Sequence, residues 1–124
     1  MDVSGVWYGR WTAERPVYPN SFIAHLVEAG GAFSGSTTEP DLNRRPGILR
    51  AFVEGGRAGP EIRFVKQYGG RLSHAILYTG QINRTGTEIT GIWHFSAHSG
   101  SFTMQRERFT TEELEQWEEV SEPI

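Results

Sequence analysis

The stretch W-H-F-S-A-H-S-G-S-F-T-M-Q-R, at residues 93–106, decides the fold of this chain. Apolar and polar residues alternate on both sides of a short polar turn around residues 98–100, which predicts a β-hairpin. The apolar row of its second strand ends on Arg106. An inward row that ends on an arginine needs an apolar group for that side chain to cover. The candidate is Trp7, so we expect Arg106 and Trp7 to form a structural clamp.

The composition favours many short strands over a helical bundle. The chain has 124 residues, enough for one domain with a core, and only 37% of them are apolar. It contains 15 glycines and 7 phenylalanines, together with 4 tryptophans and 4 tyrosines. Glycine and aromatic residues with few aliphatic ones are typical of strands joined by tight turns.

Charge, cysteine content and hydropathy exclude several classes of protein. A formal net charge of -3 with thinly spread basic residues does not suggest nucleic-acid binding. The absence of cysteine excludes disulfides, thiolate catalysis and cysteine-ligated metals. Neither a signal peptide nor a run of apolar residues long enough to cross a membrane is visible. We expect a soluble, cytoplasmic protein without a membrane partner; a mature secreted chain is the alternative.

Turn signals divide the chain into eight predicted strands. They cover residues 3–12, 21–29, 32–39, 48–54, 61–68, 73–83, 87–95 and 101–108. Strands joined by hairpin-length turns form a meander, and closing the meander removes its exposed edges. We therefore predict an all-β, eight-stranded antiparallel up-and-down barrel over residues 1–108.

Residues 109–124 differ in kind from the rest of the chain. Thr110 and Thr111 precede acidic residues, which is typical of a helix start. Leu114, Trp117 and Val120 would then share one helical face. We predict a short amphipathic helix that packs on its own barrel or on a partner.

Several short motifs resemble those of avidins, streptavidins and lipocalins. S-G-V-W-Y at residues 4–8 resembles the opening strand of avidins, and its G-x-W is similar to the lipocalin signature. Arg106 resembles the arginine that covers this tryptophan in lipocalin-type barrels. Further short matches are Phe22-Ile23, Gly31-Ala32-Phe33-Ser34-Gly35, Lys66, Gly80-Gln81, Ile89, Trp93 and Phe102-Thr103. The resemblance, which covers nearly all of residues 4–106, implies a calycin-like barrel that associates into dimers or tetramers.

The same resemblance implies that biotin would be held by polar groups on the first three strands and walled in by tryptophans. The positions of the biotin-binding residues carry Gly9, Thr37, Glu39, Val65, His74, Ile76 and Gly100 here. Asn20 and Asn43 stand near two polar positions, and Trp93 keeps one wall. We therefore expect a ligand other than biotin.

Alternation predicts which side chains line the barrel interior. Alternation and the resemblance together give the candidate ligand-binding residues, of which Asn20 and Asn43 are implied by the resemblance alone: Trp11, Asn20, Thr37, Glu39, Asn43, His74, Tyr78, Trp93 and Phe95. His74 and Tyr78 share a face and could bind one end of a ligand, or be hydrogen-bonded core residues. Glu39 is either an inward acid at the mouth or a solvated loop residue.

The strand at residues 61–68 is the least certain in register. Ile62 and Phe64 are predicted to face inward, Val65 is equally plausible there, and a slip of one residue reverses the face. Lys66 and Arg63 are expected on the outer surface.

Motifs for enzymes and metals are missing from the sequence. No nucleophile elbow, phosphate-binding loop or paired carboxylates is visible, and the four histidines have no metal-ligand spacing. We expect no cofactor or metal, with haem on one inward histidine as a lesser alternative. Catalysis by His74 and Tyr78 as base and acid is a third hypothesis.

The leading hypothesis is a non-enzymatic barrel that binds a small apolar or aromatic molecule at its open end. The alternative is a filled barrel that serves as a structural or oligomerisation module. Ile23, Val27, Leu77 and Ile92 should point outward. So much exposed aliphatic surface favours a homo-oligomer, a dimer or a tetramer.

Overall fold

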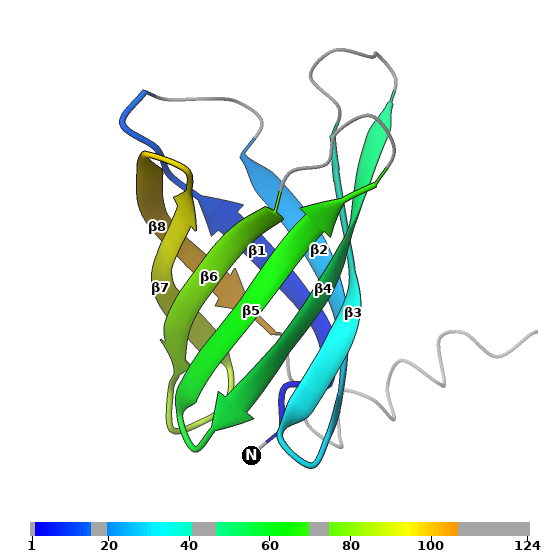
Figure 1. Ribbon diagram of the computed structural model, residues 1–124. Helices are drawn as coiled ribbons and strands as arrows, with labels where there is room; N and C mark the ends of the chain where they lie inside the picture. The colour runs from blue at the N-terminus through cyan, green and yellow to red at the C-terminus, as the bar shows by residue number, and fades with distance from the viewer. Residues whose placement is uncertain (1, 16–19, 41–46, 70–74, 107–124) are drawn as a thin grey trace, which may run out of the picture.

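The computed structural model describes residues 2–15, 20–40, 47–69 and 75–106. Eight strands follow one another: β1 (Gly5–Trp11), β2 (Ser21–Ala29), β3 (Ala32–Pro40), β4 (Ile48–Ala58), β5 (Glu61–Tyr68), β6 (Ala75–Ile82), β7 (Glu88–Phe95) and β8 (His98–Gln105). Each strand pairs antiparallel with its neighbours in sequence, and β8 returns to β1 (Figure 1). The all-β, eight-stranded up-and-down barrel predicted from the sequence is confirmed, and this fold is compatible with that of calycins.

The alternation of apolar and polar residues closes the sheet around a core. On β2, Phe22, Ala24 and Leu26 are buried, whereas the residues between them are exposed. The same period of two places the aromatic rows of the other strands inside, because successive side chains of a strand point to opposite faces. Pairing between Trp11 and Phe102 at the β1–β8 seam completes the barrel, so that none of the eight described strands has a free edge.

Aromatic side chains fill the middle of the barrel. The rings of Phe64 and Tyr78 are stacked, with centroids 4.6 Å apart and planes 7° from parallel. Phe102 contacts both of them edge-on, with centroids 6.0 and 5.0 Å away. Buried aliphatic residues surround this stack; they include Val3, Leu26, Val53, Ile62, Ile82, Ile89 and Met104.

Arg106 covers Trp7 at the end of the barrel where the described N-terminus lies, which we call the lower end (Figure 1). The guanidinium carbon lies 4.5 Å from the centroid of the Trp7 ring. Its Nη1 donates to the carbonyl of Ser4 at 2.7 Å and its Nη2 to that of Gly86 at 2.6 Å. The indole Nε1 of Trp7 donates to the carbonyl of Val3 at 2.8 Å. The first residues, the last strand and the β6–β7 turn are thus fastened together.

Two turns differ from the predicted ones: the turn after β4 is shorter, and the turn between β7 and β8 lies earlier in the chain. β4 continues to Ala58, and its hairpin with β5 turns at Gly59 and Pro60, because residues 55 and 56 pair with both neighbouring strands. The turn between β7 and β8 consists of Ser96 and Ala97, not of residues 98–100. Ser96 takes a positive φ of 55°, which serine tolerates in a single turn position although it is uncommon outside glycine.

Candidate ligand-binding site

Lys66 points into the barrel, so its predicted position on the outer surface is wrong. Its side chain is 1% exposed, and it follows Ile62 and Phe64 in the inward row of β5. The prediction went by residue type, since lysine is rarely buried. The period of two along the strand prevails over that preference, and it also places Val65 outside.

The partner of Lys66 is Glu39 from β3. The Nζ atom of Lys66 lies 2.9 Å from Oε1 of Glu39, whose side chain is 11% exposed. The phenol of Tyr68 donates a hydrogen bond to the same carboxylate oxygen. Of the two interpretations of Glu39, the inward acid is therefore correct. Glu39, Lys66 and Tyr68 together form what we call the Lys66 cluster.

Three aromatic rings surround the ammonium group of Lys66. Its Nζ atom lies 4.7 Å from the centroid of Phe22, 5.1 Å from that of Tyr68 and 6.0 Å from that of Tyr78. A ring face attracts a cation, most strongly where water is excluded. Gly9 makes this possible, since a Cβ atom there would lie 2.1 Å from the ring of Phe22.

Burial shifts the protonation equilibria of the site. Desolvation lowers the pKa of Lys66, and the charge and hydrogen bond of Glu39 oppose that change in part. Desolvation raises the pKa of Tyr68, and the Glu39 carboxylate raises it further. The pKa of Tyr78 is raised by the same two causes, again with desolvation first. Both phenols therefore stay protonated through the neutral range, whereas the lysine is closer to losing its proton than an exposed lysine is.

Thr37 adds a buried hydroxyl group to the interior. It lies two residues before Glu39 in the inward row of β3 and is buried. Within the described part of the chain its hydroxyl has no hydrogen-bond partner. An unpaired buried hydroxyl is destabilising by about 1–3 kcal/mol, which is why such groups are rare in proteins.

Two tryptophans lie at the upper end, where β1, β3, β5 and β7 finish (Figure 1). The rings of Trp11 and Trp93 meet edge to face, with centroids 6.1 Å apart, and both residues are partly buried. The indole Nε1 of Trp93 donates to the carbonyl of Thr12 at 2.8 Å. Gly100 leaves room for this contact, because a Cβ atom there would lie 1.9 Å from the same carbonyl oxygen.

The structure brings together some of the residues predicted for the site. Thr37, Glu39 and Tyr78 lie in the interior, and Trp11 and Trp93 lie against each other at the upper end. Asn20 supports this end instead of facing the interior cluster: its Nδ2 donates to the carbonyl of Trp11 at 2.7 Å. Phe95 is partly buried at the last position of β7. His74, Asn43 and the predicted C-terminal helix fall outside the described residues.

Lys66 is the functional candidate that the prediction missed, although two signals for it are present in the sequence. It has the same parity as Ile62 and Phe64 on its strand. It is also the only lysine of the chain, in which the other eleven basic residues are arginines.

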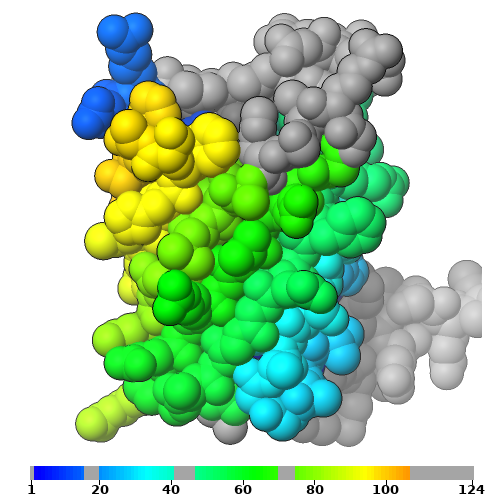
Figure 2. Space-filling model, viewed as in Figure 1, coloured from blue at the N-terminus to red at the C-terminus, as the bar shows by residue number. Residues whose placement is uncertain are grey.

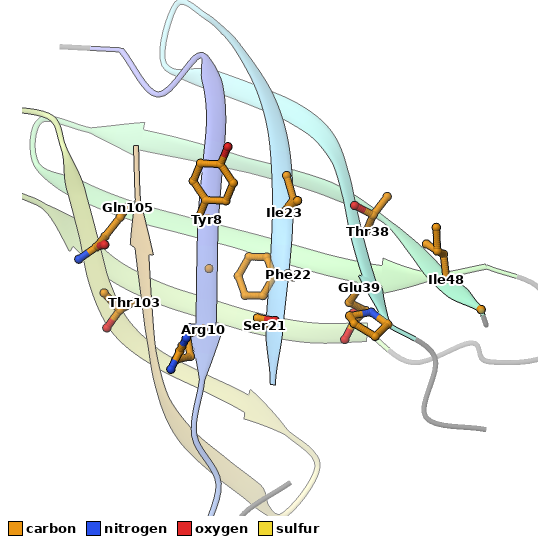
Figure 3. Close-up of a pocket in the computed structure, with 13 residues that line it drawn as sticks. Tyr8, Arg10, Ser21, Phe22, Ile23, Thr38, Glu39, Ile48, Thr103 and Gln105 are labelled. Carbon is orange, nitrogen blue, oxygen red and sulfur yellow. The ribbon is translucent and has the colours of Figure 1, made fainter. Parts of the chain in front are cut away.

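Besides a smaller one of about 380 Å³ over β3, β4 and β5, two hollows formed by described residues lie on the outer wall of the barrel. One of about 840 Å³ crosses β8, β1, β2 and β3, and Figure 3 shows Tyr8, Ile23 and Thr38 along it. The other, of about 1230 Å³, lies over β4 to β7, part of the face in Figure 2. Glycines 55, 56, 80 and 91 are among the residues that line this second hollow.

Within the described ranges no three side chains of histidine, aspartate or glutamate are grouped so that they could hold a metal ion. The same part of the chain has no helix that is long and apolar enough to span a membrane. A scan against known protein families finds no match, and a search of curated proteins finds none either.

Proposed function

We propose that this protein binds a small, largely aromatic molecule at the upper end of its barrel, without catalysing a reaction. The observation that carries the proposal is the Lys66–Glu39 ion pair inside an aromatic interior. Trp11 and Trp93 would form the apolar wall of the site. The Lys66 cluster and the hydroxyl of Thr37 would meet one polar group of the ligand.

The energetics of a buried ion pair support a functional role. Removing a carboxylate and an ammonium from water costs several kcal/mol for each ion, and their attraction offsets that only in part. Apolar side chains of similar volume would stabilise a barrel core at least as well. Charged groups with shifted pKa values inside an apolar interior are therefore candidates for binding or catalysis.

The donors and acceptors of the cluster indicate the chemistry of the ligand. An ammonium group has three N–H donors, of which Glu39 uses one. A carbonyl or carboxylate oxygen on the ligand could accept from the others, and the same ligand group could pair with Thr37. The rest of the ligand would be aromatic, because the surrounding side chains are rings.

Tryptophan fluorescence tests the proposal directly. Titration with a panel of aromatic aldehydes, ketones, carboxylic acids and alcohols should quench the emission saturably for at least one class. Trp93→Ala should weaken binding by about tenfold, which is a typical effect for an aromatic wall. Phe52→Ala is the matched control, because Phe52 is 70% exposed on the outer face of β4. The proposal fails if no member of the panel binds the wild-type protein.

A second candidate function is self-association, favoured by apolar side chains on the outer wall. Val65 and Leu77 lie opposite each other on β5 and β6, and Ile92 is 50% exposed on β7. A patch of this kind is typical of a contact surface. Sedimentation velocity should show a dimer or tetramer that Ile92→Glu converts to monomer, and a monomeric wild type at all concentrations would exclude this function.

A further inference from the structure

We infer that Lys66 captures carbonyl compounds covalently, as a reversible imine with an aldehyde or ketone at the upper end of the barrel. The inference rests on the proposed binding function and names the class of ligand. It goes beyond that function, because the lysine becomes a nucleophile and not only a hydrogen-bond donor.

The residue type at position 66 favours covalent chemistry over a purely structural ion pair. Arginine is the residue best suited to a buried ion pair, and it never loses its proton in proteins. This chain uses arginine for its other described ion pair, in which Arg57 Nη2 lies 2.8 Å from Glu28 Oε2. Lys66, the single lysine among twelve basic residues, is the only side chain whose amine can react with a carbonyl group.

The surroundings of Lys66 supply the groups that imine formation needs. The Glu39 carboxylate, 2.9 Å from Nζ, can accept the ammonium proton and so free the lone pair of the nitrogen. The nitrogen then attacks the carbonyl carbon, and a C–N bond forms as the C–O π bond breaks. A proton moves from this nitrogen to the new alkoxide oxygen, which gives a carbinolamine. The proton held by Glu39 then passes to the hydroxyl of the carbinolamine, and the C–O bond breaks to release water as the nitrogen lone pair forms the C=N bond. The sum is one ammonium and one carbonyl compound giving one iminium ion and one water.

The product fits the site as well as the free lysine does. An iminium ion keeps the single positive charge of the ammonium, so its attraction to Glu39 and to the rings of Phe22 and Tyr68 persists. The interior position of Lys66 also limits access of water, which would hydrolyse the imine. The lowered pKa of Lys66 acts in the same direction, because it raises the fraction of reactive amine at neutral pH.

Reductive trapping on the full chain tests the inference. Cinnamaldehyde is incubated with the protein and sodium cyanoborohydride, and the labelled residue is found by peptide mass mapping. The modification adds the mass of the aldehyde less one oxygen atom. The α-amino group is the internal reference, since Lys66 is the only other amine of the chain. We expect labelling of Lys66 to exceed that of the α-amino group by about tenfold, as positioning next to a general base predicts.

One variant and one second probe separate covalent capture from binding alone. Lys66→Arg keeps the cation and should lose the trapped adduct while the α-amino group still reacts. Cinnamyl alcohol, which cannot form an imine, reports binding alone through tryptophan quenching. If the alcohol binds while only the α-amino group is trapped, the imine is refuted and the binding function stands. If the alcohol does not bind and the aldehyde does not react at Lys66, both the binding function and the imine are refuted for this ligand class. Trapping at Lys66 in the wild-type protein supports both, and this result does not depend on whether Lys66→Arg folds.

Discussion

The two ends of the barrel differ in how their polar side chains are paired. At the lower end, Arg106 shares its donors between two carbonyl groups and covers Trp7. Nearby, Arg57 donates to both carboxylate oxygens of Glu28, with Nε–Oε1 and Nη2–Oε2 distances of 2.8 Å. In the upper half, Lys66 and Glu39 form an ion pair away from water, and the hydroxyl of Thr37 has no partner among the described residues.

The difference indicates that the two ends meet different demands. At the lower end the Arg57 side chain is 17% exposed, and the Glu28 carboxylate, although its side chain is only 4% exposed, accepts hydrogen bonds from Arg57 and from the backbone N–H of Val3. These hydrogen bonds offset the cost of desolvation and hold the ends of the chain in place. Charged groups in the upper half are desolvated and gain little net stability. The lower end thus fastens the barrel, whereas the upper half retains polar groups that are costly to desolvate.

Breaking the buried ion pair should have the largest effect. Glu39→Gln leaves the Lys66 ammonium without its counter-ion, so the free energy of unfolding should fall by about 3–5 kcal/mol. Urea denaturation measures this change. The double variant Glu39→Gln/Lys66→Met should recover most of it, because no unpaired charge remains. Equal instability of the single and double variants would show that Glu39 stabilises the barrel through other contacts.

A shift to alkaline pH should have the second-largest effect and should lower the free energy of unfolding. The pKa values of Tyr68 and Tyr78 are raised in the folded protein, so above about pH 10 the unfolded chain loses phenol protons that the folded chain keeps. Stability should therefore fall by roughly 1.4 kcal/mol per pH unit for each phenol. Lys66 has the opposite effect on the pH dependence of stability. Because its pKa is lowered in the folded protein, the free energy of unfolding rises with pH until the pH reaches the pKa of the unfolded chain, near 10.5.

Urea denaturation between pH 8 and pH 12 measures this profile. Tyr78→Phe should halve the loss above about pH 10, since one of the two phenols is removed. A profile that Tyr78→Phe leaves unchanged would contradict the assignment.

Arg106→Ala separates fastening from binding. The loss of two hydrogen-bonded carbonyl contacts and of the cover on Trp7 should lower the free energy of unfolding by about 2 kcal/mol. The affinity for a ligand identified by fluorescence should stay unchanged, whereas Trp93→Ala should change it. Arg63→Ala, on the exposed face of β5, is the control for loss of charge alone. A loss of affinity in Arg106→Ala equal to that in Trp93→Ala would remove the distinction between the two ends.

Thr37→Val should have the smallest effect on stability. Valine has nearly the shape of threonine and removes a hydroxyl that has no partner among the described residues. The variant should therefore be as stable as the wild type or more stable by up to about 1 kcal/mol. Its affinity for a polar ligand should nevertheless fall, which isothermal calorimetry measures. A clearly destabilised variant would mean that the hydroxyl has a partner in the protein.

The sequence predicts the barrel well because alternation and turn residues act over a few positions. The bounds of β2 and β5 agree with the predicted ranges 21–29 and 61–68. The clamp of Arg106 on Trp7 also has the predicted geometry, since an inward row that ends on a long cation leaves few other arrangements.

Details that depend on contacts between distant strands were not predicted. β4 continues through Gly55 and Gly56, which the sequence predicts as part of a turn. It does so because both glycines pair with β3 and with β5. The burial of Lys66 depends on a carboxylate 27 residues earlier in the chain, by the numbering of Glu39 and Lys66. Residue type argued against burial, and only alternation argued for it.

Because the chain has a single lysine on a buried strand, cleavage at that residue can measure how often β5 separates from the barrel. An endoprotease specific for lysine has one site in the chain, after a residue in the inward row of β5. That strand is paired on both sides, to β4 and to β6. The peptide bond can enter a protease only after β5 leaves the barrel, so the rate of this single cut would measure the free energy of that opening.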